Sequence, residues 1–175
     1  MSARRSKLIQ RVSEWTEGQL RYRPPDDDNA WCTLQVLDHL CRSEALFRQT
    51  CEQTLTRPPV HVSPAERRRA VCFIWSLRLP IKLRLPAILE AIRPGEPDCL
   101  ETVLQRWNSE HEQLGQILKD QGSAIRDVGV IKHPATGYMD LSTSLLFHSV
   151  HLRHQEYQIA LRYLGYVRWH STSPF

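Results

Sequence analysis

The sequence is poor in glycine and has no long hydrophobic run, and each absence excludes a class of protein. Only 7 of the 175 residues are glycine and runs of β-branched residues are few, so a mainly helical chain is expected. No stretch is apolar enough to cross a bilayer, and the N-terminus lacks the apolar core of a signal peptide. We therefore expect a cytoplasmic protein with no membrane partner.

Closely spaced cysteine pairs are also missing. The five cysteines are odd in number and never form a Cys-x-x-Cys pair, which excludes zinc-finger and dithiol redox motifs. Reduced, mostly buried thiols are the state expected in a cytoplasmic protein. The cysteines are Cys32, Cys41, Cys51, Cys72 and Cys99.

The charge of the chain is mild and gives no sign of a nucleic-acid partner. Its net charge is +4, from 23 basic and 19 acidic residues, whereas nucleic-acid binding needs a concentrated basic face. The run from Arg67 to Arg69 is better explained as the solvated start of a helix. Neither a Gly-rich phosphate loop nor a Gly-x-Ser-x-Gly elbow is present. We expect no nucleic-acid binding.

What the chain does contain is a series of helical patterns separated by prolines and glycines. A length of 175 residues is enough to bury a core, and we expect one domain over residues 1–175. Ser63-Pro64-Ala65-Glu66 is a helix start with an N-cap, a proline and an acidic first turn. Helices are expected over residues 6–20, 33–56, 65–79, 98–121 and 141–164, with a short turn at 87–92 and a loop at 129–137.

The last predicted helix carries most of the candidate functional side chains. At about 100° per residue, His148, His151 and Gln155 fall on or beside its apolar stripe and can point together into a helical bundle. His154 is expected to lean toward solvent. The remaining histidines that we expect to be structural or exposed are His61, His111 and His170.

Several segments resemble the DinB-like superfamily. The segment Trp31-Cys32-Thr33, followed by His39-Leu40 and then Glu44, resembles the second-helix signature of that superfamily. The turn His133-Pro134-x-x-Gly137 and the helix from His151 to Ile159 resemble its last-helix signature. Residues 82–86 resemble its lysine- and proline-bearing crossing between the middle helices. The resemblance covers most of the chain in the order expected for the family.

The resemblance implies an all-α fold, an up-down-down-up four-helix bundle with an extra short helix in the middle crossover. It also implies a central divalent metal, zinc or nickel, held by three histidines. One histidine comes from the second helix, and two come from the last helix at His-x-x-x-His spacing, which places both on one helix face. His39 and His151 match the first two, but Gln155 stands where the third is expected.

The glutamine leaves three interpretations open, because an amide oxygen is a weaker ligand for zinc or nickel than a neutral imidazole. In the first, His148 or His154 replaces the missing ligand, and His148 is the better placed. In the second, Gln155 itself completes a weakened site. In the third, the metal is absent and the cluster is a hydrogen-bonded polar patch. In all three, His39 and His151 are expected to face one another inside the bundle.

Characterised members of the superfamily include metal-dependent thiol transferases and a maleylpyruvate isomerase. The resemblance therefore implies a divalent-metal-dependent transferase that uses a low-molecular-weight thiol, with Glu44 orienting His39. The alternative is a non-catalytic bundle with a degenerate metal site that binds a small ligand or dimerises. The first and last helices have more apolar positions than one bundle interior needs, and superfamily members often pair through helices, so we expect a homodimer.

Overall fold

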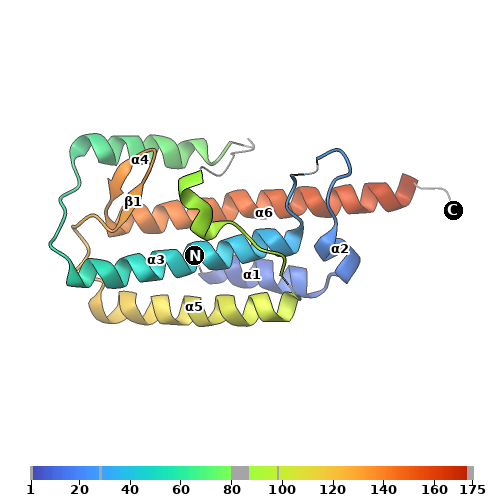
Figure 1. Cartoon of the computed structure of the whole chain (residues 1–175), viewed down its shortest axis with the longest axis horizontal. Coiled ribbons are helices and arrows are strands. Elements are labelled where there is room, and N and C mark those ends of the chain that lie inside the picture. The colour runs from blue at the N-terminus through green and yellow to red at the C-terminus, as the bar shows by residue number, and fades with distance from the viewer. Residues whose placement is uncertain (1, 28, 80–86, 98, 173–175) are drawn as a thin grey trace.

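Long helices that lie along the longest axis of the molecule dominate the structure (Figure 1). The computed structural model describes residues 2–27, 29–79, 87–97 and 99–172. Within these ranges the chain is mostly helical, which confirms the expected class. The elements are α1 (Ser2–Ser13), α2 (Glu17–Arg21), α3 (Thr33–Thr56), α4 (Pro64–Ser76), the 3-10 helix η1 (Ala87–Ile92), α5 (Leu100–Gln121), β1 (Ile131–His133), β2 (Gly137–Met139) and α6 (Leu141–Thr172).

Local capping signals set the start of the two helices whose beginnings were predicted best. In α4 the backbone N–H of Glu66 donates to Ser63 Oγ at 3.2 Å, and the N–H of Ser63 donates back to Glu66 Oε2 at 2.9 Å. The bounds of α3 agree with the prediction, although its N-cap is Cys32. There the Cys32 N–H donates to the side-chain oxygen of Gln35 at 3.1 Å. Helix α4 ends at Ser76, three residues before its expected end.

Three helix predictions need correction. Residues 6–20 do not form one helix, because Thr16 and Gln19 form a capping box that ends α1 and starts α2. Helix α5 begins after an N-cap at Cys99, and Asp98, the expected cap, lies outside the described residues. Helix α6 continues past residue 164 to Thr172. Residues 82–86, which resemble the family crossing, also lie outside the described residues.

A small antiparallel hairpin of β1 and β2 takes up much of the expected loop at 129–137 and extends beyond it to Met139. Its turn needs Gly137, whose φ is 83°, a left-handed conformation that favours glycine. A Cβ at this position would also lie 2.5 Å from Glu66 Oε1. That carboxylate accepts a hydrogen bond from the Tyr138 N–H at 3.0 Å, and so it joins the hairpin to the start of α4.

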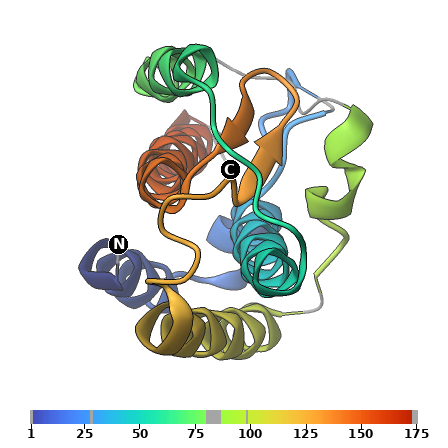
Figure 2. The same cartoon turned by 90° about the vertical axis from the view of Figure 1, so that its left-hand side faces the viewer.

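Helix α3 is central among the long helices. It contacts α5, α6, η1 and α2, and in the end-on view it lies beside α5 and α6 (Figure 2). Helix α4 packs on another side of α6. Helix α1 is tied to α5 and α6 by Arg5 with Asn108 at 2.7 Å and by Arg4 with Glu156 at 2.6 Å. One buried apolar cluster draws on α1, α3, α5 and α6, and includes Leu8, Val12, Leu34, Leu37, Val103, Trp107, Leu152 and Ile159.

We expect Glu66→Gln to lower the free energy of unfolding at neutral pH. Hydrogen bonds from the Tyr138 N–H and from Ser63 lower the pKa of Glu66 from 4.5 to about 2. The charged carboxylate therefore stabilises the fold above pH 4.5, and this contribution is lost as the pH falls toward 2. Urea unfolding across this range should show the deficit of the variant shrinking as the pH falls.

The matched control is Glu14→Gln at an exposed position, which should leave stability unchanged. If Glu66→Gln lowers the free energy of unfolding by as much at about pH 3 as at about pH 7, the stabilising form of Glu66 is not the ionised carboxylate.

Candidate functional site

The structure brings His39 of α3 and His151 of α6 together in the interior. Their Nε2 atoms lie 3.1 Å apart, although the residues are separated by 112 positions in the chain. The ring centroids are 5.1 Å apart and the planes are nearly perpendicular, at 81°. The two side chains thus point toward one another in the interior, as expected from the sequence, with their rings in an edge arrangement.

A backbone carbonyl fixes the orientation of His39. Its Nδ1 donates to the carbonyl oxygen of Ile92 in η1 at 2.7 Å, which leaves the Nε2 lone pair directed at His151. Burial lowers the pKa of His39, and the hydrogen bond to Ile92 opposes this only in part. The predicted role for Glu44 in orienting His39 is wrong, because its carboxylate binds Trp107 and His111 instead.

Gln155 completes the contact on the side of His151. The amide Nε2 of Gln155 lies 3.0 Å from His151 Nε2, and the amide Oε1 is buried without a hydrogen-bond partner. Burial, and then the neighbouring His39, lower the pKa of His151 well below its ordinary value, so its ring is neutral at neutral pH. His151 and Gln155, four residues apart in the sequence, are thus in contact on one face of α6.

With the Gln155 amide in this orientation, the hydrogen-bonding atoms of His39, His151 and Gln155 cannot all be satisfied. If His151 Nε2 accepts from Gln155, its lone pair faces the lone pair of His39, and two acceptors repel at this distance. If His151 Nε2 carries the proton, it faces the amide N–H of Gln155 instead. Turning the amide over removes the conflict and places Oε1 against His151.

The same atoms fit a shared cation. Two imidazole nitrogens bound to one tetrahedral ion at about 2.0–2.1 Å lie about 3.3 Å apart. The observed separation of the Nε2 atoms, 3.1 Å, is close to this value. With the amide turned, the unpartnered Oε1 of Gln155 supplies a third lone pair beside the other two. The groups that could hold a cation here are two neutral imidazoles and one amide oxygen, and in the described ranges no cluster of three or more histidine, cysteine, aspartate or glutamate side chains is placed to do so.

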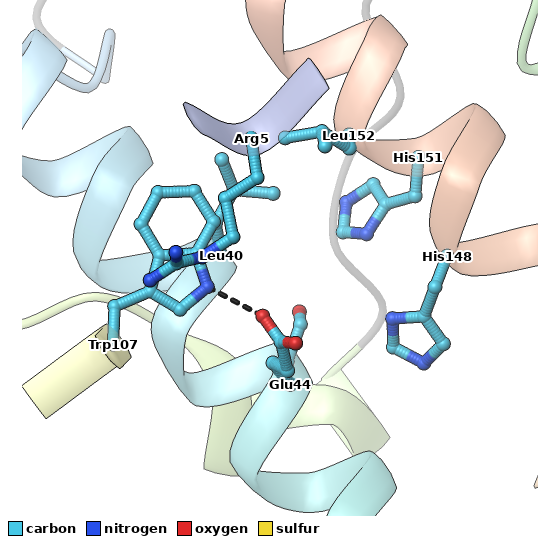
Figure 3. A pocket seen from close by; sticks show the side chains of 8 residues that line it. Arg5, Leu40, Glu44, Trp107, His148, His151 and Leu152 are labelled. Carbon is cyan, nitrogen blue, oxygen red and sulfur yellow. Dashed lines mark hydrogen bonds between the residues drawn. The ribbon is translucent and has the colours of Figure 1, made fainter. Parts of the chain in front are cut away.

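His148 lies beside this group and not within it. Its ring stacks on Phe47 with centroids 4.4 Å apart, and burial lowers the pKa of His148 to about 4. In the described part of the chain no hydrogen bond joins His148 to His39, His151 or Gln155. His148 lines a small cavity together with His151 (Figure 3).

The expectation that His154 leans toward solvent is wrong. His154 is buried, and its Nδ1 donates to the carbonyl oxygen of Leu77 at 3.1 Å, just beyond the end of α4. Its Nε2 accepts from Gln158 at 3.1 Å. The side of α6 that bears His154 is covered because α4 packs against it. His154 therefore joins two helices and is turned away from the imidazole pair.

Two further histidines take part in buried contacts that the sequence did not predict. His133 lies against the rings of Phe73 and Phe147, at 4.6 and 5.7 Å between centroids, and burial lowers the pKa of His133. His111 Nδ1 lies 2.5 Å from Glu44 Oε1. The Glu44 and His111 pair joins α3 to α5 across 67 positions of sequence, so no local spacing could have indicated it.

The fold and this site define a helical protein built around a buried imidazole pair. Comparison with known families makes the class specific: the family model of the DinB superfamily matches residues 1–159, which include His39, His151 and Gln155. The chain belongs to the DinB superfamily. No curated protein and no solved structure matched the chain. Among the described residues, no helix is both long and apolar enough to span a bilayer.

We expect His148→Phe to make the stability of the protein less dependent on pH. The pKa of His148 falls from 6.5 to about 4 on folding, so the unfolded chain takes up a proton first as the pH drops through this range. Burial of His148 therefore lowers the free energy of unfolding of wild type by on the order of 3 kcal/mol as the pH falls from 6.5 to 4. Phenylalanine keeps the stack on Phe47 and removes the titration.

Urea unfolding at several pH values measures this slope for wild type and variant. His61→Phe, at an exposed position, serves as the control and should retain the wild-type slope. An unchanged slope in His148→Phe would show that burial of this imidazole is not coupled to stability.

Proposed function

We propose that α1, α3, α5 and α6 form the up-down-down-up four-helix bundle of the superfamily, with η1 as the extra short helix in the middle crossover. In Figure 1, α1 and α6 run in one direction and α3 and α5 in the other. All four contribute to the same buried cluster, whereas α4 and η1 lie in the chain between α3 and α5. This arrangement places His39 and His151 on facing helices of the bundle.

For the site, we propose a divalent cation of the zinc or nickel kind, held by His39, His151 and Gln155. The observation that carries this proposal is the convergence of two neutral imidazole nitrogens at 3.1 Å beside a buried amide whose oxygen has no partner. Metal ligands must be unprotonated, and burial keeps the pKa of both imidazoles low. The Ile92 carbonyl behaves as the outer partner that orients a ligating imidazole.

The activity that this site supports best is transfer of a low-molecular-weight thiol to an electrophile. A bound cation of this kind supplies Lewis acidity, which lowers the pKa of a thiol and favours the nucleophilic thiolate. Aromatic side chains of the chain would shield such a site. The ring centroids of Trp31 and His39 are 5.1 Å apart, and Phe147 stacks on His151 with centroids 5.7 Å apart. Both imidazoles therefore have an aromatic neighbour that excludes water.

A cytoplasmic location is consistent with this chemistry. All five cysteines are free thiols, with Cys32, Cys41 and Cys51 buried. A reducing compartment keeps such thiols, and a small thiol substrate, in the reduced form.

The second candidate is a non-catalytic bundle that binds a small ligand beside a degenerate metal site. The observation in its favour is the amide of Gln155. Turned over, it lets Oε1 accept from a His151 N–H that is shared with His39, and this satisfies all three groups without a cation. Metal binding distinguishes the two candidates.

We expect Gln155→His to bind zinc roughly tenfold more tightly than wild type, or better, because an imidazole is the stronger ligand. His39→Ala should bind none, since it removes the ligand from the facing helix. Calorimetric titration with zinc, together with the metal content of protein purified without a chelating tag, measures both effects.

Gln158→His is a closely matched control. It creates the same i,i+4 imidazole pair with His154, whose other nitrogen is already held by Leu77. In the ranges that the structure describes, no hydrogen bond joins His154 to another imidazole. Zinc should bind no more tightly there than in wild type. If neither wild type nor Gln155→His binds zinc, the non-catalytic candidate replaces the transferase.

We also propose a homodimer that pairs through the C-terminal half of α6. Tyr157, Leu161 and Leu164 lie on one stripe of this helix and are 46%, 42% and 62% exposed. This half of α6 extends past the other long helices in Figure 1. A stripe of this kind can pair with its own copy about a two-fold axis, which removes its apolar side chains from water.

Leu164→Glu should convert the dimer into a monomer in sedimentation velocity at micromolar concentration, because the charge would be buried at the interface. The folded monomer should be unaffected, since the side chain is exposed. Val71→Glu on α4, which is 44% exposed, should remain dimeric. Wild-type protein that sediments as a monomer would contradict the proposal.

A further inference from the structure

A small cavity lies next to the imidazole pair, between α1, α3, α5 and α6 (Figure 3). Its volume is about 20 Å³, which is enough for one water molecule. Its walls combine apolar and polar side chains: Arg5, Leu40, Ser43, Glu44, Trp107, His148, His151 and Leu152.

Polar atoms in the cavity wall lack partners within the protein. Arg5 and Ser43 are each only 6% exposed, yet Arg5 Nε and Ser43 Oγ form no hydrogen bond in the described structure. His148 also forms no hydrogen bond in the described part of the chain. Buried polar groups are rarely left unpaired, and a cavity with several of them is the kind that retains water.

Arg5 is held firmly enough to serve as a fixed donor in this wall. Its Nη2 donates to Asn108 Oδ1 at 2.7 Å, and its guanidinium lies 4.5 Å from the ring centre of Trp107. Burial lowers the pKa of Arg5, and the charge of Glu44 opposes that change. The cavity thus contains one buried cation and one buried carboxylate, whose charges balance.

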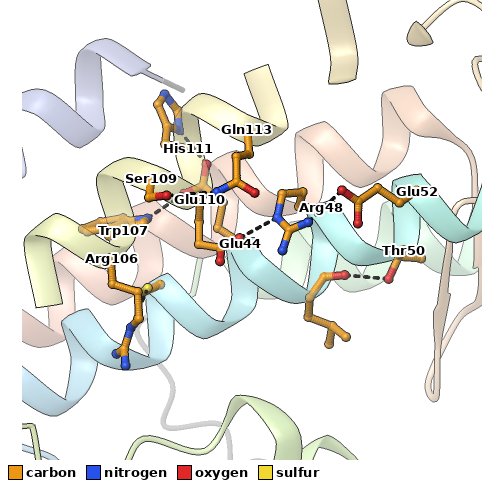
Figure 4. A network of polar contacts seen from close by, with 12 residues as sticks. Glu44, Arg48, Thr50, Glu52, Arg106, Trp107, Ser109, Glu110, His111 and Gln113 are labelled. Carbon is orange, nitrogen blue, oxygen red and sulfur yellow. Dashed lines mark hydrogen bonds and ion pairs between the residues drawn. The ribbon is translucent and has the colours of Figure 1, made fainter. Parts of the chain in front are cut away.

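The carboxylate of Glu44 links the cavity to the edge of the protein. Glu44 Oε2 accepts from Trp107 Nε1 at 2.6 Å, and Glu44 Oε1 lies 2.5 Å from His111 Nδ1 (Figure 4). The side chain of His111 is 23% exposed, in contrast to the 6% of Glu44. Glu44, His148 and His151 all line this cavity (Figure 3).

We propose that this cavity is a binding site for one water molecule, and that His111, Glu44 and this water form a proton path from the surface to His148 beside the imidazole pair. Solvent protonates His111, which passes its Nδ1 proton to Glu44. Glu44 gives a proton to the water as the water gives one of its own to the unprotonated nitrogen of His148. Each transfer breaks one N–H or O–H bond and forms another, and no electrons are exchanged.

The path does not depend on the proposed cation, so the protein can be tested without added metal. A crystal structure of the whole chain should show water within hydrogen-bond distance of Arg5 Nε and Ser43 Oγ. The rate at which His148 exchanges a proton with solvent can be measured by relaxation dispersion of its ring carbon signals, at a pH where this residue titrates.

Two variants interrupt the path at different points. Ser43→Val fills the cavity, and His111→Phe removes the outer proton carrier while leaving the cavity intact. Both should slow proton exchange at His148 roughly tenfold or more. Thr33→Val is the control, because it removes another buried, unpartnered hydroxyl from the same helix, away from the cavity. Its exchange rate should stay within about twofold of wild type.

A dry cavity would overturn the water site. Exchange at the wild-type rate in both Ser43→Val and His111→Phe would overturn the proton path. If Ser43→Val does not fold, His111→Phe alone decides the path, and the wild-type crystal structure alone decides the water.

Discussion

The contact between His39 and His151 is the constraint around which the interior is built. Two neutral imidazoles meet at 3.1 Å in the interior, where unsatisfied polar atoms cost free energy. Their placement requires α3 and α6 to pack at a fixed register, and it requires η1 to present the Ile92 carbonyl to His39. An apolar pair at these positions would tolerate small shifts, whereas hydrogen bonds at about 3 Å do not. The polar site therefore specifies the alignment of its helices more closely than the surrounding leucines do.

Helix α3 also holds its buried carboxylates, Asp38 and Glu44, by hydrogen bonds and ion pairs to other parts of the chain. The carboxylate of Asp38 binds Arg42, Arg106 of α5 and the N–H of Gly95, and Glu44 binds Trp107 and His111 of α5. His39 faces α6 and η1 instead. The central helix is thus attached to its surroundings by polar contacts on several sides, and these contacts accompany the burial of Asp38, His39 and Glu44. Removing one partner from such a contact leaves a buried charge or lone pair, and that is costlier than a lost surface contact.

Local signals allowed much of the fold to be predicted. The missed break between α1 and α2 is also local, a capping box of Thr16 and Gln19, whereas the error at His154 is nonlocal in origin. The capping box of Ser63 and Glu66 and the long apolar period after Thr33 are contained in short stretches of sequence, so α4 and α3 were placed well. Helix α6 continues past Gly165, and this glycine lies against Tyr22, where a Cβ would be 2.9 Å from the ring. His154 was misplaced because a single apolar stripe cannot reveal that α4 covers a second side of α6. At the site, the pairing of His39 with His151 followed from the family pattern, whereas the Glu44 and His111 pair has no sequence signal.

Gln155 differs from histidine in a way that changes what the site can do. A neutral imidazole that accepts at one nitrogen must carry its proton on the other, so its hydrogen-bonding pattern is tied to its tautomer. The amide of Gln155 can present either N–H or oxygen to His151 by rotating, with no proton gained or lost. It can therefore serve as a hydrogen-bond partner of the imidazole pair and, after rotation, as an oxygen ligand. At the cation site proposed above, such a set of two nitrogens and one oxygen would be of intermediate softness, which would favour zinc or nickel over magnesium or calcium. An amide in place of a third imidazole would hold such an ion less tightly, and it would let the three side chains satisfy one another without the ion.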